Sequence, residues 1–126
     1  MGLIDDIAQD IHNQGIAVLG QNLFIGYMPQ TPDTCIAVFE TGGLKPSIDL
    51  PLSDPTFQVL IRASTYLSGR TLLNSIRMRY HQFYNGMLVP NGTYFYSIVV
   101  QGEGAQLPQD ANQLELFSIN FLCKIR

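Results

Sequence analysis

The segment from Pro55 to Tyr84 constrains the fold more than any other part of the chain. In its first part, apolar residues occupy every second position: Phe57, Val59, Ile61 and Ala63. A period of two is typical of a strand with one buried face. After Ser68-Gly69 the apolar residues follow a helical spacing instead: Leu72, Leu73, Ile76, Tyr80, Phe83 and Met87. The segment therefore predicts a strand followed by a long helix, as in a layered α+β fold.

A second helix is predicted near the start of the chain, over residues 3–14. Its apolar residues share one helical face: Ile4, Ile7, Ala8 and Ile11. Asp5 and Asp6 lie in its first turn, where the helix dipole favours negative charge. An assembly arm is an alternative, but packing on the core of the same subunit is favoured for a short amphipathic helix.

The other elements are predicted to be strands. Apolar or alternating runs occupy residues 16–19, 23–28, 35–40, 94–101 and 114–126. The first two could pair or form one bent strand. Asn91-Gly92 predicts a tight turn before residues 94–101. We expect one α+β domain over residues 1–126, with a mainly antiparallel sheet of about four to five strands and two helices packed on it, in the order α-β-β-β-α-β-β.

Two connections are predicted to be extended loops, residues 44–54 and 102–112. The first contains two prolines, so it cannot form a regular element. It also carries four large apolar side chains: Leu44, Ile48, Leu50 and Leu52. Such a loop either packs back on its own domain or docks on a neighbouring molecule, and the sequence does not decide between the two.

The composition is low in charge. Charged residues make up 13% of the 126 residues, against about 25% in ordinary soluble domains. A surface with so little charge suggests coverage by partners, although a moderately soluble monomer is the alternative. The net charge of −3 argues against non-specific nucleic-acid binding as the main role. Cys35 and Cys123 lie in apolar strand patterns, which favours buried thiols over a disulfide.

No run of residues is long and apolar enough for a membrane span. The acidic N-terminus lacks the basic start of a signal peptide, so we expect synthesis in a cytoplasm without membrane insertion. Catalytic, metal and cofactor motifs are not apparent. His12 and His81 have no Cys, Asp or Glu at ligand spacing, and no serine lies in a nucleophile elbow. The sequence therefore predicts a protein that is not an enzyme and uses no cofactor.

Four of the arginines lie in the segment from Pro55 to Tyr84: Arg62, Arg70, Arg77 and Arg79. Arg70 and Arg77 are two helical turns apart and share a face, whereas Arg79 lies about 200° round the helix from Arg77. Together with Arg62 on the strand, Arg70 and Arg77 are candidates for a surface that meets a neighbouring subunit or lines a DNA passage. The low charge favours solvated positions or ion pairs between subunits over nucleic-acid binding.

The stretch NLFIGYMPQTPDTCIAVFETGG, residues 22–43, resembles the small minor capsid proteins of long-tailed bacteriophages. In that family a strand leads into a proline-containing M/L-P-x-T-P-D loop, and a strand ending in E-T-G-G follows. The resemblance continues through PTFQVLIRAS, the long helix, the Asn-Gly turn and FSINFLCKIR. In the loop 102–112 only Leu107 and Asp110 match the family pattern.

The resemblance implies a structural virion protein of the tail terminator or tail-completion type. Such a subunit is expected to form a ring, commonly of six copies, at the tail–head junction. The ring would end the tail tube and join the tail to the head. Implied partners are further copies of the chain, the tail-tube protein and a head-completion or connector protein, with DNA passing through the ring without specific binding. Another phage assembly role, such as a tail-tube subunit or a head-completion protein, is the alternative, and a small ligand-binding domain is less favoured.

Overall fold

The computed structural model describes residues 3–42, 54–88, 91–102, 104–109 and 113–125. Two helices and seven strands form the fold. Their order is α1 (Leu3–Asn13), β1 (Leu23–Ile25), β2 (Cys35–Glu40), β3 (Thr56–Ala63), α2 (Tyr66–Tyr80), β4 (Phe83–Leu88), β5 (Thr93–Val100), β6 (Ala105–Leu107) and β7 (Glu115–Ile125). The α+β class agrees with the sequence prediction.

The strands form one mixed sheet in the order β1-β2-β3-β7-β5-β4, and β6 also pairs with β7. All strand pairs are antiparallel except β1 and β2, which are parallel. The prediction of four to five strands was therefore wrong, and the antiparallel description was incomplete. Strand pairing joins residues that are distant in the chain, so a local pattern does not reveal its direction.

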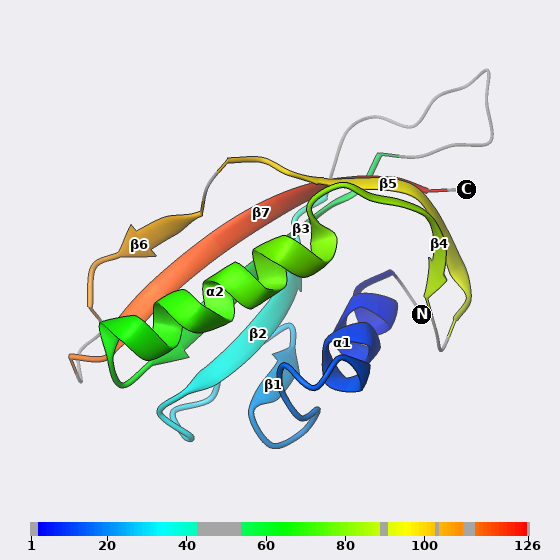
Figure 1. Cartoon of the computed structure of the whole chain (residues 1–126). Coiled ribbons are helices and arrows are strands. Elements are labelled where there is room, and N and C mark those ends of the chain that lie inside the picture. Colours follow the sequence, from blue (N-terminus) through cyan, green and yellow to red (C-terminus); the bar gives the residue numbers. More distant parts are fainter. Residues whose placement is uncertain (1–2, 43–53, 89–90, 103, 110–112, 126) are drawn as a thin grey trace.

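The core strands match the predicted alternation. Phe57, Val59 and Ile61 on β3 are fully buried. They lie opposite Phe121, Ile119 and Phe117 on β7, and these residues are also buried. Both helices cover this face, with α2 over β3 and β7 and α1 beside β1 and β2 (Figure 1).

The chain after α2 corrects the predicted helical stripe. The helix ends at Tyr80, and Gln82 takes a positive φ of 61°. Phe83 and Met87, expected on the helix, belong to β4, where they pair with Ile98 and Tyr94 of β5. A spacing of four residues fits one face of a helix, but it is also an even number and so occurs equally in a strand. The pairing of β4 with β5 keeps one register on both sides of Asn85, which takes a positive φ of 52°. The hairpin turn at Asn91-Gly92 was predicted correctly.

The start of α2 also differs from the prediction. The helix begins at Tyr66, and the hydroxyl of Thr65 accepts a hydrogen bond from the backbone N–H of Ser68, a typical N-cap. Gly69, which suggested a turn in the sequence, lies inside the helix. A Cβ at this position would meet the ring of Phe117 and the Cβ of Ala63. Glycine is therefore required for the close packing of α2 on β3 and β7.

The sheet curls toward α1 at its β4–β5 end (Figure 1). The register between β5 and β7 shifts between Phe95 and Ser97, and such an irregularity bends a strand. The predicted loop 102–112 contains β6, which pairs with Ser118, Phe117 and Leu116 of β7.

Candidate interaction surfaces

Arg62, predicted to lie on an interaction surface, is held within its own chain. Only 6% of this residue is exposed. Its Nε donates to the carbonyl of Asp33 at 3.1 Å, and its Nη2 donates to the carbonyl of Pro32 at 2.6 Å. The guanidinium thus anchors the proline-containing loop that precedes β2. This contact explains why a charged residue can be buried on β3, because two backbone carbonyls accept hydrogen bonds from its guanidinium.

Arg79 and Tyr80 join the end of α2 to α1. Arg79 donates two hydrogen bonds to the carboxylate of Asp10, at 2.9 and 2.8 Å, and the hydroxyl of Tyr80 donates to the same carboxylate at 2.7 Å. The hydrogen bonds that Arg79 donates to Asp10 raise the pKa of Arg79. Burial, together with the nearby negative charge of Asp10, raises the pKa of Tyr80. The cluster is an internal clamp between the two helices.

Asp6 makes a second internal connection, between α1 and the β4–β5 hairpin. Its carboxylate accepts hydrogen bonds from the backbone N–H groups of Asn91, at 2.7 Å, and Thr93, at 3.0 Å. Asp6 is fully buried. The sequence indicated only a favourable position in the helix dipole for this residue. Its partners lie 85 and 87 positions further along the chain, where no local pattern reveals them.

The outer side of α2 is exposed and combines apolar with polar side chains. Leu67, Thr71, Asn74 and Met78 follow one another at helical spacing and are all exposed. Leu67 is 74% and Met78 79% exposed. Thr71 and Leu67 also line an open groove of about 400 Å³ that includes Leu72 and Thr34. Arg70 and Arg77 flank this stripe and are partly exposed.

The two flanking arginines differ in their surroundings. Arg77 has further interactions within the chain. For Arg70, the described part of the structure contains no ion pair and no side-chain hydrogen bond. The structure thus separates the three predicted arginines: Arg62 is used internally, and Arg70 and Arg77 border the exposed side of α2.

Leu44, Ile48, Leu50 and Leu52, the other predicted interface residues, lie in the segment 43–53, outside the described residues. Their role as an interface remains a prediction.

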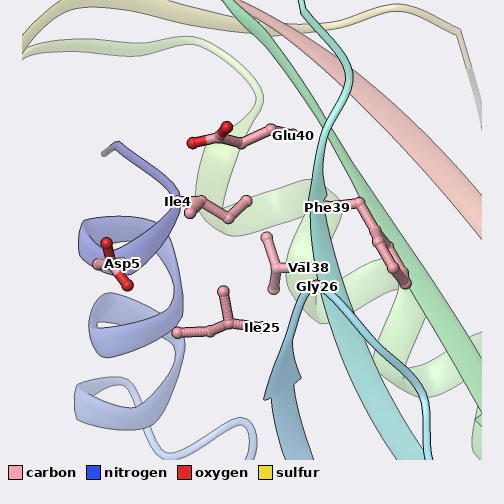
Figure 2. A pocket seen from close by; sticks show the side chains of 7 residues that line it. All are labelled: Ile4, Asp5, Ile25, Gly26, Val38, Phe39 and Glu40. Carbon is pink, nitrogen blue, oxygen red and sulfur yellow. The ribbon is translucent and has the colours of Figure 1, made fainter. Parts of the chain in front are cut away.

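An open pocket of about 410 Å³ lies between the first turn of α1 and strands β1 and β2 (Figure 2). Ile4, Ile25 and Val38 form its apolar floor, and the carboxylates of Asp5 and Glu40 stand at its rim. Sequence reasoning missed this site. Glu40 follows the last buried residues of β2, and only the tertiary packing of α1 brings it near Asp5.

The outward face of the β4–β5 hairpin is a further exposed apolar surface. Tyr84, Met87 and Tyr96 are exposed, and the ring of half-buried Tyr94 contacts that of Tyr96 at 5.1 Å between centroids. The sequence could not show this patch, because its pattern placed Met87 on a helix. An exposed group of large apolar side chains is typical of an interaction surface.

Catalytic chemistry has little support in the described residues. They contain no group of three or more potential metal ligands, and none of their helices is long and apolar enough to cross a membrane. His12 accepts a hydrogen bond from the backbone N–H of Leu19 at 3.1 Å. Both cysteines are buried free thiols, as predicted, and burial raises the pKa of Cys123 to about 12.

A family model described as "Bacteriophage tail terminator protein" matches residues 11–126. The chain belongs to this family. The match confirms the resemblance inferred from the sequence, and it covers every strand, helix α2 and the end of α1. The tail terminator family is a family of structural proteins of the phage tail, so the chain is a virion-associated tail protein.

A solved structure supports the same fold for this tail terminator. It is a chain from the virion of a native gene transfer agent (GTA) particle, with a TM-score of 0.64 and 8% sequence identity. The alignment covers 84% of this chain and 79% of that chain. At this identity the likeness concerns the fold alone. Among curated proteins, no sequence matches the chain.

Proposed function

We propose that this tail terminator forms a closed ring, commonly of six copies in proteins of this type, at the junction between tail and head. The ring ends growth of the tail tube and provides the surface on which the head docks. Its partners are further copies of itself, the tail-tube protein and a head-completion or connector protein. The protein is made in the host cytoplasm, and DNA passes through the ring without specific binding.

The observation that carries this proposal is the family match over residues 11–126. The surface of the chain supports it. The exposed stripe of α2 and the exposed aromatic patch of the hairpin are different surfaces on different elements. Contacts between unlike surfaces of identical subunits are heterologous, and they close into rings when the rotation between subunits allows it. A structural neighbour from a phage-like virion is consistent with assembly in such a particle.

The low charge fits a subunit that is covered on several sides in the virion. Only 13% of the residues are charged, and the net charge is −3. A negative net charge also disfavours tight binding to the phosphate backbone. This property suits a passage through which DNA must move freely.

The test is reconstitution with tail tubes. Purified protein should form rings with an open centre in negative-stain images, either alone or on the ends of tubes assembled from the tail-tube protein. Adding it during tube assembly should shorten the tubes and stop their growth, compared with tubes assembled without it. Only monomers in mass photometry, both alone and with tubes, would contradict the proposal. Polymerisation of the protein itself into long tubes would support the role of a tail-tube subunit instead.

A further inference from the structure

The two helices carry opposite charge. Helix α1 contains three aspartates, Asp5, Asp6 and Asp10, and neither lysine nor arginine; helix α2 contains three arginines and no acidic residue. Part of this charge is paired inside the subunit. Asp10 binds Arg79, and Asp6 accepts hydrogen bonds from the β4–β5 hairpin. Glu40 lies at the surface on the α1 side, where Asp5, which has a further interaction of its own, lines the same pocket. Arg70 lies on the α2 side, as does Arg77, which also has further interactions within the chain.

The pocket beside α1 has the shape and chemistry to receive an arginine. Its floor is apolar, and Ile4, Ile25 and Val38 point toward one another in it (Figure 2). An arginine can lay its aliphatic stem on such a floor while its guanidinium meets carboxylates at the rim. Glu40 supplies that carboxylate: it is exposed, and the described residues provide it with no hydrogen-bond donor or cation. Asp5 places a second negative charge on the same rim.

Arg70 has the complementary properties. It lies beside the exposed stripe of α2, next to Leu67 and Thr71, without a partner in the described structure. Within one subunit it cannot reach the pocket. Arg79 and Tyr80 of α2 hydrogen-bond to α1, and Arg70 lies nine positions before Arg79, about 14 Å along the helix axis. Figure 1 shows the N-terminal end of α2 directed away from α1. The described residues therefore offer Arg70 no acidic partner within its own subunit, which leaves its guanidinium available to another molecule.

We infer that a second copy of the chain supplies this partner: Arg70 of one copy enters the pocket between α1 and β2 of the next and binds Glu40. This inference rests on the proposed ring and names the two surfaces that meet in it. The exposed stripe of α2, with Leu67 and Met78, then packs beside the pocket, and Arg77 lies two turns further along the same border. The two surfaces are unlike, as a ring requires. The opposite charges of Arg70 and Glu40 determine which surfaces meet and in which register. Electrostatic complementarity provides this kind of specificity between partners.

Charge reversal tests the contact. Arg70→Glu and Glu40→Arg should each raise the protein concentration needed for ring formation by roughly tenfold or more, because each places like charges together. The double variant should restore assembly by re-forming the pair with its charges exchanged. Lys124→Glu is the matched control: it makes the same change of charge as Arg70→Glu at an exposed residue of β7. It removes an ion pair with Asp54, of 3.6 Å, but such a pair at the surface contributes little to stability, so this variant should assemble normally. Circular dichroism and thermal unfolding confirm that each monomer is folded.

The outcomes separate this inference from the proposed function. Normal rings from either single variant overturn the contact while leaving the ring intact. Folded single variants that fail to assemble, with no recovery in the double variant, also overturn the pairing. Absence of rings for the unmodified protein, both alone and on tail tubes, overturns the proposed function and this contact with it. Recovery in the double variant supports the contact.

Discussion

At the scale of a residue, Asp6 joins the beginning of the chain to a hairpin 85 positions away. Its buried carboxylate accepts from two backbone N–H groups, and each of its oxygens receives one of them. Asp6→Asn keeps the size of the side chain but replaces one acceptor by an NH₂ donor that faces a backbone N–H. We expect a loss of about 1–3 kcal/mol in the free energy of unfolding, measured by urea denaturation. Asp33→Asn makes the same chemical change at an exposed side chain and should have little effect; equal losses in both variants would contradict the argument.

Single residues also show what the sequence can and cannot reveal. The burial of Phe117, Ile119 and Phe121 was predicted from their spacing, because one alternating strand contains the whole signal. The roles of Arg62 and Asp6 were not predictable in this way. Each is a charged residue whose hydrogen-bonding partners are backbone groups of a distant loop or turn. Burial of a polar side chain depends on such partners, and they appear only once the chain has folded.

At the scale of an element, Gly69 shows that packing can outweigh helix propensity. Alanine is favoured over glycine inside a helix by about 1 kcal/mol. At this position, however, a new Cβ would meet the buried ring of Phe117 and would lie 3.3 Å from the Cβ of Ala63. Overpacking of this kind costs about 1–3 kcal/mol, so Gly69→Ala should lower the melting temperature. Asn74→Ala, on the exposed side of the same helix, should raise it slightly. A melting temperature that rises for both variants would show that α2 can shift away from the sheet.

The elements with one regular period were the ones predicted well. Strands β2, β3 and β7 and helix α1 each keep their pattern from end to end. The prediction was wrong at the two ends of α2, for opposite physical reasons. At its start, Gly69 indicated a turn although tertiary packing places it in the helix. At its end, the spacing of four residues between Phe83 and Met87 fitted a helix, although it is equally compatible with the strand β4 that contains them. Because Phe83 and Met87 were assigned to a helix, the exposed aromatic patch of the β4–β5 hairpin could not be predicted.

At the scale of the whole molecule, the topology of the sheet was beyond the reach of local patterns. The parallel pairing of β1 with β2, and the position of β7 between β3 and β5, depend on contacts between distant segments. The acid-rimmed pocket has the same origin, since it forms only where α1 packs beside β1 and β2. The apolar faces of the helices and strands could be predicted from the sequence. The surfaces that stay exposed after these faces have packed could not be predicted in this way.

Stability of the whole molecule should fall in alkaline solution, because its core holds protonated groups that ionise once the chain unfolds. Burial raises the pKa of Cys123 from 9.0 to about 12 and also raises that of Tyr80 above its ordinary value of 10.0. Between pH 9 and about 12 the unfolded chain loses the Cys123 proton while the folded chain keeps it. The folded state then binds more protons, so the free energy of unfolding decreases as the pH rises, by about 1.4 kcal/mol per pH unit for each such group.

Urea denaturation at successive pH values measures how the free energy of unfolding changes with pH. The variant Cys123→Ala shows how much of that change comes from the Cys123 thiol. The variant loses packing at every pH, but its free energy of unfolding should fall less steeply than that of the unmodified protein between pH 9 and about 12. Tyr80→Phe should reduce the slope only above about pH 10, since the tyrosine hydroxyl begins to ionise there in the unfolded chain. Parallel slopes for Cys123→Ala and the unmodified protein would show that this thiol is reached by solvent in the folded state. Cys123 lies on β7 and Tyr80 on α2, and both belong to one buried cluster. Reduced slopes in both variants would therefore show that helix and sheet expose these groups in the same unfolding transition.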